Sequence, residues 1–376
     1  MAKLKVMTVV GTRPEIIRLS RVIPKLDEHC EHILVHTGQN YDYELNGVFF
    51  EQLGIRKPDF FLDSAGVTAA ETIGQVIIGA DRVMQNCQPE ALLVLGDTNS
   101  CLSVIPAKRR KIPIFHMEAG NRCFDFRVPE EVNRKVVDHV ADINLPYTDI
   151  ARDYLLREGF PPDQIIKTGS PMREVIAHYQ QGISDSDVLD RLDLREYAYF
   201  VVSFHREENV DDPKNLEKIL EILNALAGRF GMPVIVSTHP RTRKRIDEIG
   251  VDANPLVQFH KPFGFHDYIR LQVGSRAVLS DSGTITEESS ILNYPALNLR
   301  EVHERPEGFE EASVMMVGLD LNRVFQALGV LADQRRGDHR TVGLVRDYEV
   351  QNVSEKVLRI ILSYTGFVNR NVWRKH

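Results

Sequence analysis

The stretch KVMTVVGTRPE, residues 5–15, decides the fold class. Its run Val6–Val10 is apolar and rich in β-branched residues, which favours a strand buried on both faces. Gly11 interrupts this run, and Pro14 stands where a helix would begin, because the first helical turn does not need the missing N–H. A buried strand that turns directly into a helix indicates the first βα unit of a parallel sheet.

Similar units recur along the chain. After the opening run come HILVHTG, ALLVLGD, IPIFHME, INLPYT, IIKTG, YFVVSFH, PVIVSTH, VQFH and AVLSDSG, each followed by polar residues and then by a segment of helical period. Strands and helices that alternate in this way predict an α/β fold. The series restarts at Tyr199 after the polar stretch 180–196, so we expect two doubly wound parallel sheets of similar size.

We place an N-terminal Rossmann-like domain at residues 1–172 and a C-terminal one at residues 173–354. The tail, at about 355–376, has an apolar helical period and is expected to be a helix that closes the N-terminal domain. Ligands of such sheets bind beyond the carboxyl ends of the strands. Two sheets whose strand ends face each other would form a cleft between the domains.

The composition excludes several classes of protein. Lys plus Arg number 46 and Asp plus Glu 53, which gives a net charge of −7. This mildly acidic balance argues against nucleic-acid binding, which needs a basic surface. No apolar run approaches the ~18 residues of a membrane helix, and the first run is too short for a secretion signal. The cysteines form no CxxC pair, which is typical of reduced thiols. We therefore expect a cytoplasmic protein without membrane insertion.

Polar side chains follow several predicted strands, at the edge where a parallel sheet exposes reactive groups. Asp97 follows ALLVL, and Glu118 shares one face of its strand with His116. Glu130 and Glu131 begin the next predicted helix. Two carboxylates from separate loops can divide proton transfer and charge stabilisation between them. The simpler alternatives are that Asp97 caps a helix and that Glu131 only complements a helix dipole.

A second group of residues is suited to an anion. Arg13 and the turn Ser282-Gly283 each precede a predicted helix whose free N–H groups favour phosphate. The other candidates follow strands of the second series: His205, His239, Glu287, Glu288, Arg300 and Arg305. Either Glu287 or Glu288 could reach a ribose hydroxyl. The first turn lacks GxGxxG and GxxxxGK[ST], so neither nicotinamide binding nor a P-loop is supported. The histidines at 29, 32 and 36 lack the spacing of a metal site.

Taken together, these motifs resemble the non-hydrolysing UDP-N-acetylglucosamine 2-epimerase family over about residues 5–320. The resemblance rests on GTRPE, HTGQNYD, LGDTNS, HMEAGNR, PEEVNR, SFHREEN, THPRT, SDSGTITEE and ERPEG, in this order. It implies the GT-B architecture of two Rossmann-like domains. It also implies inversion at C2 of a UDP-N-acetylhexosamine, in which UDP is eliminated to give a 2-acetamidoglycal and then added back.

The resemblance also implies roles for individual residues. Asp97, Glu118 and Glu130 match the catalytic carboxylates of the family. The other matches are the diphosphate site (Arg13, His205, Ser282 and Gly283), further active-site positions (Arg134 and His239) and the ribose contact (Glu288). Arg18 stands where these enzymes typically have a lysine, which changes geometry but not charge. No metal or nicotinamide cofactor is implied, and a homodimer through helices of the N-terminal domain is expected by resemblance alone.

The loop before PEE points to a subgroup of that family. NRCFDFRVPEE, residues 121–131, resembles the enzymes that make UDP-N-acetyl-L-fucosamine from UDP-2-acetamido-2,6-dideoxy-L-talose in capsule and O-antigen pathways. Phe124 and Phe126 would suit the apolar methyl group at C6 of a 6-deoxy sugar. Four alternatives stay open: a UDP-N-acetylglucosamine 2-epimerase, a GT-B glycosyltransferase that needs an acceptor, a hydrolysing relative, and a nucleotide-sugar sensor, against which the three acids argue.

Overall fold

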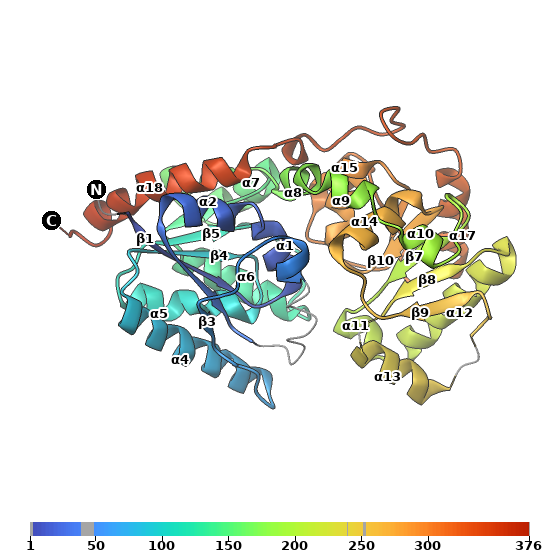
Figure 1. The fold of residues 1–376 in the computed structure, drawn as a ribbon, viewed down its shortest axis with the longest axis horizontal. Coiled ribbons are helices and arrows are strands. Elements are labelled where there is room, and N and C mark those ends of the chain that lie inside the picture. The colour runs from blue at the N-terminus through green and yellow to red at the C-terminus, as the bar shows by residue number, and fades with distance from the viewer. Residues whose placement is uncertain (1–2, 39–48, 239, 251–252, 376) are drawn as a thin grey trace. The chain divides into compact units, whose positions relative to one another are not determined.

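The computed structural model describes residues 3–38, 49–238, 240–250 and 253–375 (Figure 1). The chain divides into two compact units, of which the first comprises Met1–His178 and Asp347–His376 and the second comprises Tyr179–Arg346. In the described residues no helix is both long and apolar enough to cross a membrane.

The first unit is built on a six-stranded parallel sheet of order β3-β2-β1-β4-β5-β6. Its strands are β1 (Lys5–Val10), β2 (Glu31–His36), β3 (Phe60–Phe61), β4 (Ala91–Leu95), β5 (Ile114–Met117) and β6 (Ile143–Leu145). The strand order reverses between β1 and β4, so the ends of these two strands form the switch point where such sheets bind ligands. The prediction of a strand at IIKTG is wrong, because only Ile165 forms an isolated bridge, to Asn144.

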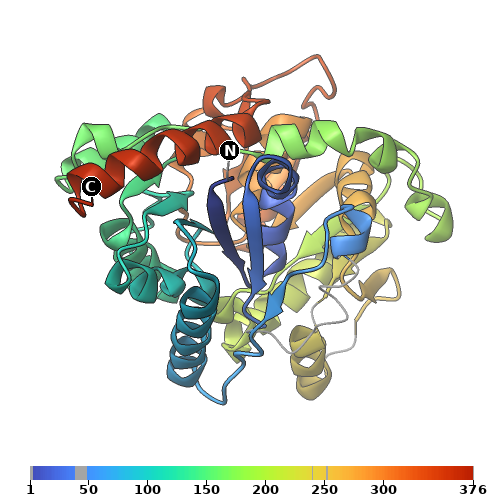
Figure 2. The same cartoon turned by 60° about the vertical axis from the view of Figure 1, so that its left-hand side comes forward.

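Helices cover this sheet. They are α1 (Arg13–Leu19), α2 (Val22–His29), α4 (Ala69–Cys87), α5 (Val104–Arg109), α6 (Pro129–Val140), α7 (Asp149–Arg157), α8 (Met172–His178) and α18 (Val353–Asn371), with 3₁₀ turns η1 (Asn99–Ser103) and η2 (Pro162–Gln164). Helix α4 begins with a capping box in which Thr68 and Glu71 bond each other's backbone N–H. The C-terminal helix α18 packs on α2, and Figure 2 shows it in red beside the blue N-terminal elements.

The second unit repeats the same topology in a sheet of order β12-β11-β10-β7-β8-β9, again with every pair parallel. Its strands are β7 (Phe200–Ser203), β8 (Val234–Ser237), β9 (Val257–His260), β10 (Ala277–Ser280), β11 (Ala296–Asn298) and β12 (Met315–Met316). Its helices are α9 (Gln180–Ser184), α10 (Val188–Arg191), α11 (Glu207–Val210), α12 (Pro213–Phe230), α13 (Pro240–Ile249), α14 (Phe265–Gly274), α15 (Thr284–Leu292), α16 (Pro306–Glu310) and α17 (Leu321–Leu331). The predicted α/β class with two doubly wound, Rossmann-like sheets is confirmed.

Both faces of the second sheet are buried, as its unbroken apolar strands predict. Phe200 and Val202 of β7 pack in one hydrophobic cluster with α12, whereas Tyr199 and Val201 pack in another, on the opposite face. This alternation follows the period of two along a strand. Ligands can therefore approach this sheet at the ends of its strands rather than on its faces.

The boundaries of the units follow from local packing. They lie at 178/179 and 346/347, beside the sequence-based boundaries of 172/173 and 354/355. Helix α8 stays with the first unit because Val175 and Ile176 are buried and the helix packs on α1. Asp347 returns to that unit by accepting a hydrogen bond from the backbone N–H of Asp149 (2.9 Å) and by pairing with Lys167 (2.7 Å).

Candidate active site

A buried glutamate joins the two strand ends at the switch point of the first unit. The carboxylate of Glu15 accepts hydrogen bonds from the Gly11 backbone N–H (3.0 Å) and the Thr12 hydroxyl (2.7 Å), after β1. It also accepts from the hydroxyls of Ser100 and Thr98, after β4. Burial raises the pKa of Glu15 to about 7, although these hydrogen bonds oppose the rise. Sequence reasoning assigned Glu15 no role, although it stands in GTRPE.

Asp97 follows β4 and is held by an arginine. Its Oδ2 lies 2.7 Å from Nη2 and 3.0 Å from Nε of Arg134, a buried side chain on α6. Asp97 does not cap a helix: Thr98 occupies the N-cap position of η1, and the Asp97 carboxylate contacts Arg134 instead. The Asp97 side chain is 26% exposed, so it is partly accessible while Arg134 holds its Oδ2.

Glu118 lies directly after β5, the neighbour of β4. Its carboxylate forms a buried ion pair with Arg18 of α1 and accepts a hydrogen bond from the Asn121 side chain (3.3 Å). The backbone of Glu118 has φ +65°, a left-handed conformation that is costly for a residue with a side chain. A Cβ on Gly96 would lie 3.7 Å from Glu118 Oε2, so this carboxylate lies beside the turn that carries Asp97.

Two more predicted residues stand at helix starts in this unit. Arg13 opens α1, and its guanidinium lies over the ring of Phe49, 5.5 Å from the centroid. Glu130 is half-buried in the first turn of α6, the helix that also carries Arg134. The structure thus groups Asp97, Glu118 and Arg134 by direct contact or close approach. It places Arg13 and Glu130 on α1 and α6, the two helices that supply the arginine partners of Glu118 and Asp97.

Glu131 shapes the loop before α6 rather than merely facing the helix dipole. Its fully buried carboxylate accepts hydrogen bonds from the backbone N–H groups of Cys123 (3.1 Å) and Phe124 (3.3 Å) and pairs with Arg134 (3.1 Å). The loop held in this way presents two phenylalanines, Phe124 and Phe126, which are 66% and 68% exposed. Exposed aromatic side chains at the edge of a site are typical contacts for an apolar part of a ligand.

In the second unit a buried aspartate organises the loop after β7. Asp281 accepts hydrogen bonds from the backbone N–H groups of His205 (3.1 Å) and Arg206 (3.0 Å) and from the Asn209 side chain (3.0 Å). The His205 ring is 52% exposed, with Nδ1 3.3 Å from Asp281 Oδ1. Asp281 therefore fixes the predicted histidine, a role that its position after β10 could have indicated.

Hydroxyl groups line the switch point of this second sheet. The Ser203 and Ser280 hydroxyls lie 2.8 Å apart at the ends of β7 and β10, and Tyr268 donates to Ser203 (2.9 Å). The Ser282 backbone N–H donates to Ser280 Oγ (3.1 Å) in the turn that enters α15. A Cβ on Gly283 would lie 2.4 Å from Glu304 Oε1, so a larger residue here would have to displace the Glu304 side chain.

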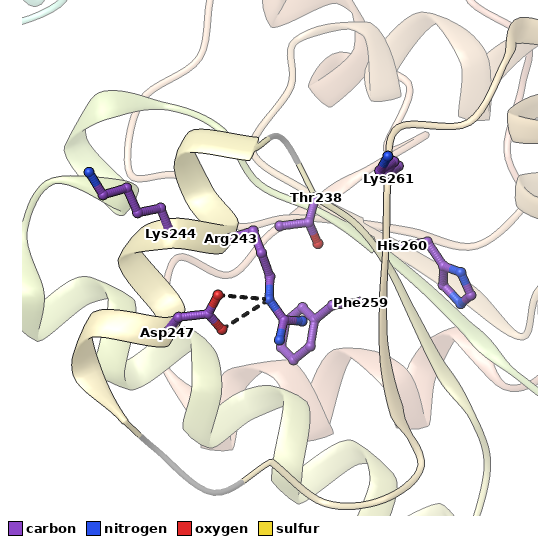
Figure 3. A pocket seen from close by; sticks show the side chains of 7 residues that line it. All are labelled: Thr238, Arg243, Lys244, Asp247, Phe259, His260 and Lys261. Atoms are coloured by element: carbon purple, nitrogen blue, oxygen red, sulfur yellow. Dashed lines mark hydrogen bonds and ion pairs between the residues drawn. The ribbon is translucent and has the colours of Figure 1, made fainter.

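The remaining predicted residues of this unit are engaged by neighbours. Arg305 pairs with the buried Glu287 (3.0 Å), and Glu288 accepts a hydrogen bond from the Gln272 side chain (2.7 Å). His239 lies outside the described residues. Beyond the adjoining strand ends of β8 and β9 lies a cavity of about 700 Å³, shown in Figure 3 and lined by Thr238, Arg243, Lys244, Asp247, Phe259, His260 and Lys261.

Comparison with known proteins identifies the family. Residues 24–362 match the family described as UDP-N-acetylglucosamine 2-epimerase. The chain belongs to this family. A UDP-2,3-diacetamido-2,3-dideoxy-D-glucuronate 2-epimerase from Pseudomonas aeruginosa is 36% identical over 306 residues, which cover 80% of this chain and 84% of that protein. The chain is therefore a UDP-sugar 2-epimerase, an isomerase.

Two solved structures of 2-epimerases resemble this one. A UDP-N-acetylglucosamine 2-epimerase from Rickettsia bellii is 50% identical and has a TM-score of 0.92, covering 99% of this chain and 100% of that chain. The Methanocaldococcus jannaschii UDP-GlcNAc 2-epimerase in complex with UDP-GlcNAc and UDP is 29% identical, with a TM-score of 0.89 over 96% and 100% of the chains. The family predicted for this epimerase from its motifs is confirmed, whereas the fucosamine subgroup stays a prediction.

Proposed function

We propose that this epimerase inverts C2 of a UDP-N-acetylhexosamine by eliminating UDP and adding it back. The observation that carries the proposal is the placement of Asp97 and Glu118 at the ends of neighbouring strands, each held by its own arginine. One carboxylate takes the C2 proton while the C1–O bond breaks and its electron pair leaves with UDP. A proton is then delivered to the opposite face of C2, and the UDP oxygen bonds C1 again.

The environment of the acids supports this chemistry. Breaking the C1–O bond builds positive charge on the sugar ring, which carboxylates stabilise, and negative charge on the diphosphate, which cations and N–H groups stabilise. The first unit supplies Asp97, Glu118 and Glu130. We assign the diphosphate to Arg13 of the first unit and to His205 and the Ser282-Gly283 turn of the second. The turn stands at the start of α15, where helix N–H groups and the helix dipole favour an anion.

For the sugar we propose UDP-2-acetamido-2,6-dideoxy-L-talose, with UDP-N-acetyl-L-fucosamine as the product for capsule or O-antigen assembly. The support is the loop in which Phe124 and Phe126 are exposed beside the first turn of α6, which carries Glu130. UDP-N-acetylglucosamine is the second candidate, favoured by the name of the Rickettsia bellii relative. We also infer a cytoplasmic homodimer that uses no metal or nicotinamide.

Proton NMR in D₂O, with each UDP-sugar in parallel, tests both the inversion at C2 and the identity of the sugar. We expect deuterium to enter C2 of the talo sugar as the fuco product forms, without added metal or NAD. Exchange in the gluco sugar alone would replace the proposed substrate with the second candidate. Exchange in neither sugar would overturn C2 inversion of these two substrates. Release of free sugar instead of epimer would indicate a hydrolysing enzyme.

A further inference from the structure

We propose that Asp138, on α6, is a positioning residue that holds Glu118 in its working conformation through His116, Gly120 and Arg122. The inference rests on the proposed catalytic role of Glu118, and nothing in the motifs assigned a role to Asp138. It concerns a buried cluster of charges directly beneath the strand end of β5, within the first unit.

Asp138 binds the chain on both sides of Glu118. Before Glu118, Nδ1 of His116 lies 2.9 Å from Asp138 Oδ1, and both side chains are fully buried. After Glu118, the backbone N–H of Gly120 lies 3.2 Å from Asp138 Oδ2, and Arg122 Nη1 donates to the same oxygen at 2.7 Å. One carboxylate therefore clamps the segment whose central residue has φ +65°.

This clamp offsets a real conformational cost. A residue other than glycine in the left-handed region costs on the order of 1–3 kcal/mol, and it persists only where its surroundings enforce it. Asp138 restrains the chain both before and after Glu118, and the N–H of Glu118 itself donates to Leu145 O at 3.1 Å. Without Asp138 the chain after β5 would be free to relax, and the carboxylate of Glu118 would move with it.

The cluster joins Asp138 to partners on both sides of Glu118. Nε2 of His116 donates to the carbonyl of Gly96 (2.7 Å), and its Nδ1 lies 2.9 Å from Asp138 Oδ1, so the ring lies between the two. Arg122 pairs with Asp138 (2.7 Å) and also with Glu158 (2.6 Å). Burial alone would raise the pKa of Asp138, but His116 and Arg122 lower it below its usual value.

The same cluster extends to the other acids of the site. The carbonyl bound by His116 belongs to Gly96, which immediately precedes Asp97. Helix α6 carries Asp138 one turn after Arg134, the partner of Asp97, and carries Glu130 in its first turn. One helix thus sets the positions of all three proposed catalytic carboxylates, and Asp138 is its connection to Glu118.

The test compares Asp138→Asn with Asp142→Asn as a matched control. Asp142 is also buried and holds the opposite, amino end of β5, by pairing with Lys108 (2.6 Å) and accepting from the Ile114 N–H (2.9 Å). Both variants of the full chain lose a buried charge. We expect Asp138→Asn to lower kcat about 100-fold, as a displacement of about 1 Å does, with KM and the Kd for UDP within about threefold of wild type. Asp142→Asn should lower Tm but keep kcat.

A second variant protects the test against a folding defect. His116→Gln leaves the pair of Asp138 with Arg122 and should also lower kcat more than it changes KM. Because both residues act on one segment, the double variant should lose much less than the product of the two single effects. A kcat like that of Asp142→Asn in either single variant would overturn the positioning role.

Glu118→Gln separates this inference from the proposed function on which it rests. Loss of turnover in Glu118→Gln, with wild-type turnover in Asp138→Asn, would remove only the positioning role. Wild-type turnover in Glu118→Gln would instead remove Glu118 from the mechanism and the positioning role with it.

Discussion

The two sheets of this epimerase share one strand order but end in different chemistry. At the switch point of the first unit, Glu15 ties the ends of β1 and β4 together, and Asp97 and Glu118 stand beside them, each paired with an arginine. At the switch point of the second unit, the hydroxyls of Ser203 and Ser280 tie β7 to β10. The acids Asp97 and Glu118 of the first edge pair with arginine side chains, whereas the acid of the second edge, Asp281, accepts backbone N–H groups.

The difference shows that the use of an acid depends on what surrounds it. Asp281 is an acid at a strand end, as Asp97 is, but it is fully buried and its oxygens accept N–H groups of the loop after β7. Asp97 is partly exposed, and its Oδ2 is held by the guanidinium of Arg134. The first arrangement builds a loop, and the second presents a carboxylate to a ligand. Equal topology therefore says little about function until the strand-end residues are examined.

The largest expected effect is that of Glu118→Gln in the first unit. Replacing a proton-transfer carboxylate by an isosteric amide typically costs 10²–10⁴ in rate, so we expect kcat to fall by about a thousandfold. The Kd for UDP, measured by calorimetry, should change less than about threefold, because other residues are assigned to the diphosphate. Glu130→Gln should behave in the same way, and a normal kcat in either variant would remove that residue from catalysis.

Glu15→Gln tests the titratable switch point. Burial raises the pKa of Glu15 to about 7, from 4.5. A raised pKa means that the folded state binds this proton more tightly, so the added stability is complete below pH 4.5 and is lost as the pH rises through 7. At 1.36 kcal/mol per pH unit the loss reaches about 3 kcal/mol. Urea unfolding at pH 5 and pH 8 should show this loss in wild type relative to Glu15→Gln.

Ser280→Ala, which removes a hydroxyl group that cannot titrate in this range from the switch point of the second unit, is the control. Its free energy of unfolding should differ from that of wild type by the same amount at both pH values. A wild-type pH dependence in Glu15→Gln would show that Glu15 is ionised throughout this range.

The sequence predicted the fold class because its signal is local. Apolar runs such as Val6–Val10, bounded by Gly11 and a helix start, are sufficient to indicate buried parallel strands. The prediction at IIKTG failed although the segment lies beside the edge strand β6: Ile165 forms a single bridge to Asn144, which is too little pairing for a strand. The two-residue strands β3 and β12 carry too little pattern to be found.

The site was predictable where a residue stands at a strand end and less so where its role depends on partners. Asp97 and Glu118 lie where the strand pattern placed them, and the structure adds their partners, Arg134 and Arg18. Asp138 lies in the last turn of α6, more than a dozen residues from the segment that it clamps, and no spacing rule indicates such a contact. Tertiary contacts of this kind become visible only when the fold brings the elements together.

Asp281→Asn tests the role of the buried acid in the second unit. The amide would place a donor against N–H groups that need an acceptor, which costs about 1–3 kcal/mol for a buried group. We expect the loop that carries His205 to shift and the Kd for UDP to rise about tenfold to a hundredfold, with kcat at saturation within about threefold. This is the reverse of the pattern for Glu118→Gln. Asp320→Asn, at the N-cap of α17, is the control and should leave the Kd unchanged.

The smallest expected effect concerns the loop that distinguishes sugars in the first unit. Phe124→Ala with Phe126→Ala should change the free energy of unfolding by no more than about 0.5 kcal/mol, because both rings are mostly exposed. If they contact the C6 methyl group, its burial is worth about 0.8 kcal/mol, so kcat/KM for the 6-deoxy talo sugar should fall about fourfold. The value for UDP-N-acetylglucosamine, whose C6 carries a hydroxyl, should fall less.

Competition between the two sugars in one tube measures the ratio of their kcat/KM values without reference to enzyme concentration. The control is Val330→Ala on α17, a change at an apolar side chain that is 68% exposed in the second unit. An unchanged ratio in the double phenylalanine variant would assign sugar preference to other residues. It would also leave the arginine-paired acids Asp97 and Glu118 as the feature that makes the first unit differ from the second.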